Sequence, residues 1–292
     1  MTLVHDRFGA AIVVVAGLFF IGPSAAGETV ADLALMTHVH GIAVDRGDPS
    51  RLMLATHHGF YAVTSTGDVE QVSETGDDFM GFTAHPTDPS ILYASGHPER
   101  GGNLGFIVSG DGGRSWSQVS EGAGGPVDFH SMDVSKSDPD VIYGSFRGLQ
   151  VSRDGGRTWE IAGPGPARLI DLAASAMDPD TVYAATEAGL QVSRDAGRSW
   201  QPTEVAGQPV SLVEVSEDGR ILAFVVGLGL LQGKEGSPEW ETLNAEFGGR
   251  ILLHLAIDPL EPERIYAVTL NSEVLASADG GKTWRPFGSD RQ

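Results

Sequence analysis

The sequence predicts an all-β fold, a six-bladed β-propeller, and three observations support this prediction. A turn-forming motif, S-x-D-x-G-x-[ST]-W, occurs four times, at Ser109–Trp116, Ser152–Trp159, Ser193–Trp200 and Ser277–Trp284. The Asp residues of successive copies are 43, 41 and 84 residues apart, so the last interval holds two periods. A period of about 40–45 residues is typical of four-stranded propeller blades. Short runs rich in Val, Ile, Tyr and Gly, broken by turn residues, favour strands over helices.

Each repeat unit contains four predicted strands. The first inner strand is predicted within Thr37–Asp45, and later inner strands begin near Asp78, Asp128, Arg168, Pro209 and Arg250. Second strands are predicted at Arg51–Thr56, Ile91–Ser95, Val141–Ser145, Thr181–Thr186, Ile221–Val226 and Arg264–Thr269. The third strand leads into the motif and the fourth begins at its Trp. We expect one domain over residues 28–292, and the pattern leaves open whether residues 28–36 add a closing strand to the last blade.

The motif has the chemistry of a hairpin turn. Its Asp can accept hydrogen bonds from turn amides, its Gly supplies a positive φ, and its Trp packs at the start of the next strand. The fifth unit keeps Trp240 without the Asp, and the first unit lacks both. We therefore expect a structural role for Asp111, Trp116, Asp154, Trp159, Asp195, Trp200, Asp279 and Trp284.

Composition excludes several classes of function. The formal net charge of −20 over 292 residues argues against binding nucleic acid or an anionic membrane surface. The chain has no Cys, which excludes disulfides and thiolate metal sites. A weakly basic start, the apolar stretch 8–21 and small residues before position 27 predict a signal peptide over residues 1–26. We therefore expect an exported protein, periplasmic or extracellular, with a retained N-terminal membrane anchor as the alternative.

With its four turns, the chain resembles the Asp-box, or BNR-repeat, propellers. That superfamily includes sialidases, xyloglucan-cleaving glycosidases, the sortilin ectodomain and a photosystem II assembly factor. The resemblance implies Asp-box hairpin turns on the face away from an active site. Most of the mature chain is also similar to bacterial exported propellers labelled glycosyl hydrolase, through His38–Gly41, His57–Gly59, Asp78–Phe82 and Ser95–Pro98. The Arg-Ile-Pro motif expected of sialidases is absent, so sialidase activity is not expected.

Histidines gather on one predicted face of the propeller. Inner-strand starts and the turns between second and third strands open on the face opposite the repeated turns. Six histidines fall there, namely His38, His40, His57, His58, His97 and His130. Alignment of the inner strands puts His40 level with Met80 and His130, and puts His38 level with Asp78 and Asp128. Polar, ligand-type residues thus crowd the channel mouth on the first three blades.

This grouping predicts a binding site at the channel mouth. In one interpretation, His38, His40, Met80 and His130 hold a metal ion. Imidazole with thioether favours copper, whereas imidazole with a carboxylate suits zinc. In another interpretation, a small polar ligand or a glycan contacts a wider polar set, made of His57, His58, Asp78, His97, Glu99, Asp128 and Arg168. A purely structural role, in which these side chains cap the channel, is the third possibility.

We therefore expect an exported binding protein, with binding favoured over catalysis. The alternative is a glycoside hydrolase in which Asp78 and Asp128 act as acid and base. Such a pair would have to lie about 5–5.5 Å apart for retention or about 6.5–9.5 Å apart for inversion. A second alternative is a scaffold for protein interaction or assembly, like the photosystem factor that the chain resembles.

Overall fold

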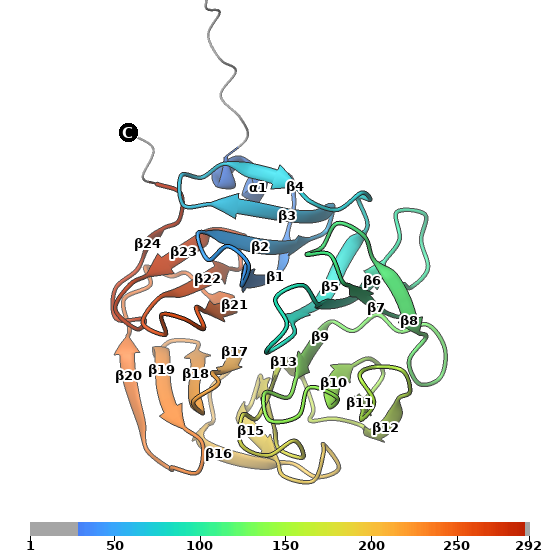
Figure 1. Ribbon diagram of the computed structural model, residues 1–292. Helices are drawn as coiled ribbons and strands as arrows, with labels where there is room; N and C mark the ends of the chain where they lie inside the picture. The colour runs from blue at the N-terminus through green and yellow to red at the C-terminus, as the bar shows by residue number, and fades with distance from the viewer. Residues whose placement is uncertain (1–28, 290–292) are drawn as a thin grey trace, which may run out of the picture.

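Six four-stranded antiparallel sheets surround a central channel in the computed structural model, as Figure 1 shows. The structure describes residues 29–289, and the predicted signal peptide lies outside these residues. The all-β prediction and the count of six blades are confirmed. Within residues 29–289, no helix is long and apolar enough to cross a membrane.

The first three blades follow one another along the chain, each with its first strand innermost. Blade one contains β1 (Val39–Val44), β2 (Arg51–Thr56), β3 (Gly59–Thr64) and β4 (Val69–Gln71). Blade two contains β5 (Asp78–Ala84), β6 (Leu92–His97), β7 (Phe106–Ser109) and β8 (Ser117–Ser120). Blade three contains β9 (Ser131–Val134), β10 (Ile142–Ser145), β11 (Leu149–Ser152) and β12 (Glu160–Gly163).

The other three blades continue the same order. Blade four contains β13 (Leu169–Ala174), β14 (Val182–Thr186), β15 (Gly189–Ser193) and β16 (Gln201–Ala206). Blade five contains β17 (Val210–Val215), β18 (Arg220–Val225), β19 (Gly229–Lys234) and β20 (Trp240–Asn244). Blade six contains β21 (Leu252–Ile257), β22 (Ile265–Thr269), β23 (Val274–Ser277) and β24 (Arg285–Pro286).

The ring closes without exchanging a strand between its ends. Residues 30–36 form helix α1 (Val30–Met36) instead of a closing strand, because Thr29 caps the helix reciprocally with Asp32. Blade six completes itself with β24. The Ser272 hydroxyl of blade six accepts a hydrogen bond from the amide of Val39 at 3.1 Å. Apolar residues of α1 and blade one pack with those of blade six in a single cluster.

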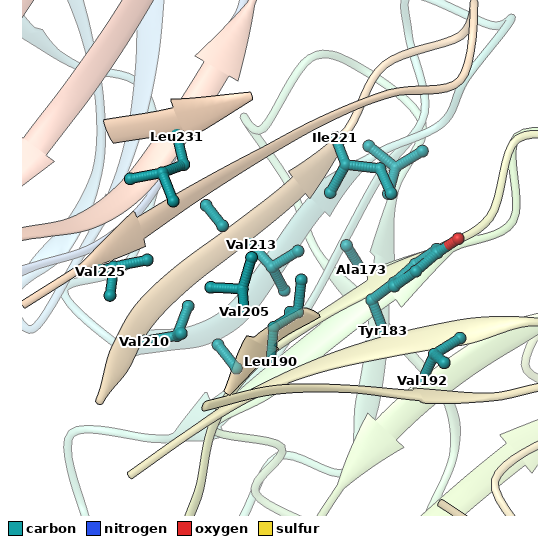
Figure 2. Packing of buried hydrophobic residues seen from close by; sticks show 13 residues of the cluster. Ala173, Tyr183, Leu190, Val192, Val205, Val210, Val213, Ile221, Val225 and Leu231 are labelled. Atoms are coloured by element: carbon teal, nitrogen blue, oxygen red, sulfur yellow. The ribbon is translucent and has the colours of Figure 1, made fainter. Parts of the chain in front are cut away.

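The core is divided among the contacts between neighbouring blades. Each of six hydrophobic clusters combines buried residues from two adjacent blades. Figure 2 shows the cluster between blades four and five, where Val213 and Ile221 lie close to Tyr183 and Leu190. Burying one such side chain stabilises the fold by about 1.5–3 kcal/mol. Since every blade has an apolar face on both sides, each one needs two neighbours.

The four repeated turns share one hydrogen-bond pattern. In the first copy, the Ser109 hydroxyl donates to Asp111 at 2.8 Å, and Asp111 also accepts from the amide and hydroxyl of Ser115 at 3.0 and 2.7 Å. The indole of Trp116 donates to the Gly113 carbonyl at 3.0 Å. The hydrogen bonds from Ser115, followed by that from Ser109, lower the pKa of Asp111 to about 2.

The second glycine of each turn allows the turn to dock on the preceding blade. Gly113 has a φ of 92°, and a Cβ atom there would lie 2.3 Å from the Phe60 ring of blade one. A Cβ atom at the equivalent Gly156 would lie 2.0 Å from the Phe106 ring of blade two. A side chain at either glycine would therefore separate two blades, in addition to straining the backbone.

The repeated turns also fix which end of each blade carries which loops. The amide of Gly112 donates to the Ser90 carbonyl, and the amide of Gly155 donates to the Asp140 carbonyl. Ser90 and Asp140 lie in the turns between first and second strands, at the far end of the inner strands from His40 and Asp78. The predicted histidine face and the repeated turns therefore belong to opposite ends of the blades.

We expect Asp111→Ala to lower the melting temperature at pH 7 by several degrees, because three hydrogen bonds to the carboxylate are lost. The pKa of Asp111 is depressed in the folded protein, so its stabilising effect is present above about pH 4 and is lost as pH falls towards 2. The difference in melting temperature between wild type and variant should therefore shrink in acid. Thermal denaturation at several pH values measures it, with the exposed Glu239→Ala as a control; a constant difference down to pH 2 would contradict this account.

Candidate functional site

A β-bulge places His40 at the channel mouth. Val39 pairs with Thr56 and Gly41 pairs with Ala55, which leaves His40 as the extra residue of β1. Bulges of this kind bend a strand and redirect a side chain. Asp78 begins β5 on the next blade, and Asp128 and His130 precede β9 on the third. The inner strands of three consecutive blades thus begin with polar residues around one end of the channel.

Asp78 lies at the centre of a first cluster. Its Oδ2 atom is 2.8 Å from Nδ1 of His57, and its Oδ1 atom is 3.6 Å from Nε2 of His40. One ligand atom from each of these three residues lies within 4.8 Å of the others. Gly96 of β6 allows the start of β5 to approach closely, because a Cβ atom at position 96 would lie 2.0 Å from the Asp78 carbonyl oxygen.

Asp128 lies at the centre of a second cluster. Its Oδ2 atom is 2.8 Å from Nε2 of His130 and 3.0 Å from Nε2 of His97. The Nδ1 atom of His97 is also 2.7 Å from the Gly102 carbonyl oxygen. A carbonyl oxygen only accepts, so Nδ1 of His97 carries a proton and the loop around Gly102 fixes the ring. The six residues His40, His57, Asp78, His97, Asp128 and His130 are called the mouth site below.

The carboxylates of the mouth site lie behind the imidazoles. The side chains of Asp78 and Asp128 are 11% and 5% exposed, whereas those of His57, His97 and His130 are 52%, 43% and 68% exposed. An incoming ligand would therefore meet imidazole first. Three buried atoms, His40 Nε2, Asp78 Oδ1 and Asp128 Oδ1, have no hydrogen-bond partner among the described residues. Unsatisfied buried polar atoms are costly and call for an explanation.

The pKa values of the two carboxyl groups are shifted in opposite directions. Burial raises the pKa of Asp78, against the effect of His57. Burial also opposes the ionisation of Asp128, but hydrogen bonds and charge from His130 and His97 outweigh it and lower the pKa. The hydrogen bond to Asp128 raises the pKa of His130. Burial, followed by the nearby His57, lowers the pKa of His40 to about 4, so this imidazole is neutral and able to bind a metal at pH 7.

The remaining predicted residues lie around the mouth site without joining either cluster. His38 is exposed, and its carbonyl accepts from the amide of His57. His58 contacts the Thr37 hydroxyl at 3.2 Å, and the exposed Arg168 pairs with Glu187 at 3.0 Å. Glu99 follows β6, where its amide donates to Asp77. Met80 is half-buried on β5, where it pairs with Ser95 of β6.

Sequence reasoning missed a second group of polar residues inside the channel. A cavity of about 350 Å³ is lined by inner strands of all six blades and by turns at the far end from the mouth site. Lys136 lies 2.5 Å from Asp133 and 3.7 Å from Glu214, and Asp171 accepts from Ser131 at 3.1 Å. These residues come from three different blades. Asp133 and Glu214 both precede the last residue of their inner strand, a shared position that alignment of the repeats could have shown, whereas Lys136 and Asp171 lie at other positions.

Burial dominates the electrostatics of this cavity. It raises the pKa of Asp171 to about 7 and that of Glu214 to about 8, although Lys136 acts in the other direction on Glu214. His254 of β21 also lines the cavity, and burial followed by the charge of His40 lowers its pKa to about 4. Gly41, which directly follows His40 in β1, also lines the cavity, so the cavity begins next to the mouth site.

Comparisons with known proteins show the fold alone. Neither a family model nor a curated protein sequence matches the chain. Among solved structures, the GH74 enzyme of Niastella koreensis has a TM-score of 0.58 at 15% identity, and the match covers 86% of this chain and 45% of that enzyme. YCF48 bound to D1 peptide has a TM-score of 0.52 at 16% identity, covering 87% and 84%. A putative gluconolactonase has a TM-score of 0.63 at 13% identity, covering 91% and 95%. The chain thus shares the propeller fold and spans less than half of the GH74 enzyme.

We expect the Asp128→Asn variant to lower the pKa of His130 in the metal-free protein, because the carboxylate that stabilises its protonated ring is removed. Imidazole resonances followed by NMR between pH 5 and 9 measure this change. The Asp77→Asn variant is the control and should leave the titration of His130 in place. An unchanged His130 titration in Asp128→Asn would show that the hydrogen bond does not form in solution.

Proposed function

We propose that this protein is an exported metal-binding propeller that takes a transition-metal ion, zinc or copper, at the mouth site. The observation that carries the proposal is the pair formed by His40 Nε2 and Asp78 Oδ1. Both atoms are buried without a hydrogen-bond partner, and they lie 3.6 Å apart. This distance is too long for a hydrogen bond, but it is close to the separation of two ligands on one ion with bonds of about 2.0–2.2 Å.

His57 would complete a set of two imidazoles and one carboxylate. It belongs to the same group of ligand atoms within 4.8 Å, and its exposed ring lies on the solvent side of Asp78. Two nitrogens and one oxygen suit zinc, and three protein ligands leave a fourth position open for water or a small ligand. Met80 would add a thioether ligand if the ion is copper.

The cluster around Asp128 would not bind the ion itself but would lie next to its ligands. Asp128 orients His97 and His130, and the charge of His130 influences both His40 and Asp78. Carboxylates behind imidazoles commonly fix ring orientation near a metal. A small anionic or polar ligand at the open position would then meet His97 and His130. Glu99 and Arg168 lie farther out and would contact only a larger ligand.

We expect wild-type protein to bind Zn²⁺ with one ion per chain, measured by calorimetry on protein without a His-tag. His57→Ala and Asp78→Asn should each weaken binding by more than the about 10–100-fold that loss of an outer partner costs. His85→Ala is the matched control, since His85 lies at the other end of β5 and caps the turn at Thr87 and Asp88. Met80→Leu should leave Zn²⁺ binding unchanged. If the bound ion is copper, the same variant should weaken Cu⁺ binding, because a thioether ligand is lost. Failure of the wild type to take up either metal would overturn the proposal.

A glycoside hydrolase is the second candidate, and one observation favours it. The environments of Asp78 and Asp128 move their pKa values apart, as in an acid and base pair. GH74 enzymes also share the fold. Against this function, both carboxylates are buried behind histidines that would have to move before a sugar could reach them. A protein partner is a further possibility, since YCF48 was solved with a bound peptide.

Hydrolysis of a panel of glycans, xyloglucan included, and of sugar lactones tests the enzyme candidate. If the protein is a hydrolase, Asp78→Asn should reduce the rate by about 10²–10⁴-fold, as removal of a general acid does. Addition of a chelator separates the two candidates, because a two-carboxylate mechanism needs no metal. Under the metal-binding proposal, we expect wild type and Asp78→Asn to be equally inactive on this panel.

A further inference from the structure

The channel cavity is large enough for an organic ligand and is distinct from the mouth site. Its volume of about 350 Å³ falls within the range of about 300–1,000 Å³ typical of ligand pockets. None of the six mouth-site residues lines it, and its other end is formed by turns such as those at Arg46, Pro86 and Asp218. A ligand could therefore occupy the cavity while a metal occupies the mouth site.

The lining combines apolar walls with an excess of negative charge. Its walls include Ile42, Phe82, Leu172 and Leu255, which favour an apolar body. Six carboxyl groups line the cavity with two permanent cations. Burial raises the pKa of two of them, Asp171 to about 7 and Glu214 to about 8, and a bound cation would favour their ionised forms. His254 is neutral at pH 7 because burial lowers its pKa. The carboxylates are Asp133, Asp171, Glu214, Glu217, Asp218 and Asp258, and the cations are Arg46 and Lys136. A cationic ligand would offset this imbalance, whereas an anion would increase it.

Glu214 is the carboxylate that can accept a hydrogen bond from a ligand. Asp133 already accepts from Lys136, from the Thr83 hydroxyl and from two backbone amides. Glu214 lies 3.7 Å from Lys136, beyond hydrogen-bonding distance, and 28% of its side chain is exposed on the cavity. Oε1 is the oxygen paired with Lys136, so Oε2 is able to accept from another donor.

The same geometry disfavours a bare metal ion at this position. The ammonium group of Lys136 lies next to Asp133 and 3.7 Å from Glu214, and it repels a divalent ion there twice as strongly as it repels a singly charged ammonium group. The volume also exceeds what one ion needs, and the apolar walls offer it no ligands.

We propose that the channel cavity is a second binding site, which takes a small organic amine. Its ammonium group would donate to Glu214 in a charge-assisted hydrogen bond, and its apolar body would pack against the walls formed by β1, β5 and β21. This site is independent of the metal ion at the channel mouth. It adds a ligand class, primary amines with an apolar body, that the mouth site does not select.

Benzylamine is the probe, with benzyl alcohol as its neutral match and benzoate as its anionic match. Calorimetry on the full chain should show benzylamine binding at least about 10-fold tighter than benzyl alcohol, and no binding of benzoate. Glu214→Gln should weaken benzylamine binding by about 10-fold or more while leaving benzyl alcohol unaffected. In a crystal soaked with 4-bromobenzylamine, the anomalous signal of bromine should lie in the channel.

Two further variants keep the test decisive. Ala84→Leu narrows the cavity from β5 and should exclude benzylamine even if Glu214→Gln proves unstable. His57→Ala removes a mouth-site ligand and should leave benzylamine binding intact, so the amine site and the metal site can fail separately. Equal affinity for benzylamine and benzyl alcohol, or benzylamine binding that survives both cavity variants, would overturn the proposal. So would Ca²⁺ binding lost in Glu214→Gln without any benzylamine binding, which would assign the cavity to an inorganic cation.

Discussion

The packing of each blade against two neighbours is the constraint on which this structure depends. All six hydrophobic clusters lie between blades, so an unpaired blade would expose an apolar face to water. The chain has no Cys, so no disulfide secures the closure between its first and last blades. Closure depends on packing of α1 and β1 with β22 and β23, and on the approach of Gly67 to Gly288. The repeated turns extend the same principle around the ring, since their glycines fit against the blade before them.

Contact between blades also explains why many polar side chains line the channel. Inner strands of neighbouring blades do not pair as one sheet, so side chains connect them. Asp133 of blade three accepts from the amide of Ala174 in blade four, and Asp171 of blade four accepts from the amide of Val213 in blade five. Ser211 donates to the carbonyl of Leu252 in the same manner. At the mouth, blades one to three carry histidines, and the side chains of Asp78 and Asp128 pair with these histidines.

The sequence predicted the strands that carry the site better than it predicted the contacts between the side chains of the site. The second strand Arg51–Thr56 has the predicted bounds, because turn residues and alternation mark both ends of it. The alignment of His40 with Met80 did not foresee the bulge, which leaves His40 unpaired whereas Met80 pairs with Ser95. Sequence could not show that Asp78 pairs with His57 rather than His38, since that choice depends on the bulge at His40. It could not show the channel cavity at all, because contacts between blades about 40 residues apart follow from the closure of the ring.

The position of the carboxylates supports the proposed binding function more directly than the family resemblance supports catalysis. A general acid or base must reach the substrate, whereas a carboxylate that orients a metal ligand must lie behind it. Asp78 and Asp128 take the second arrangement, with His57 and His130 between them and solvent. The same burial that hides the carboxylates leaves Asp78 Oδ1 and His40 Nε2 without partners, a cost that a bound ion would remove. Under the proposed function, an ion between β1 and β5 would account both for the buried carboxylates and for the atoms without hydrogen-bond partners.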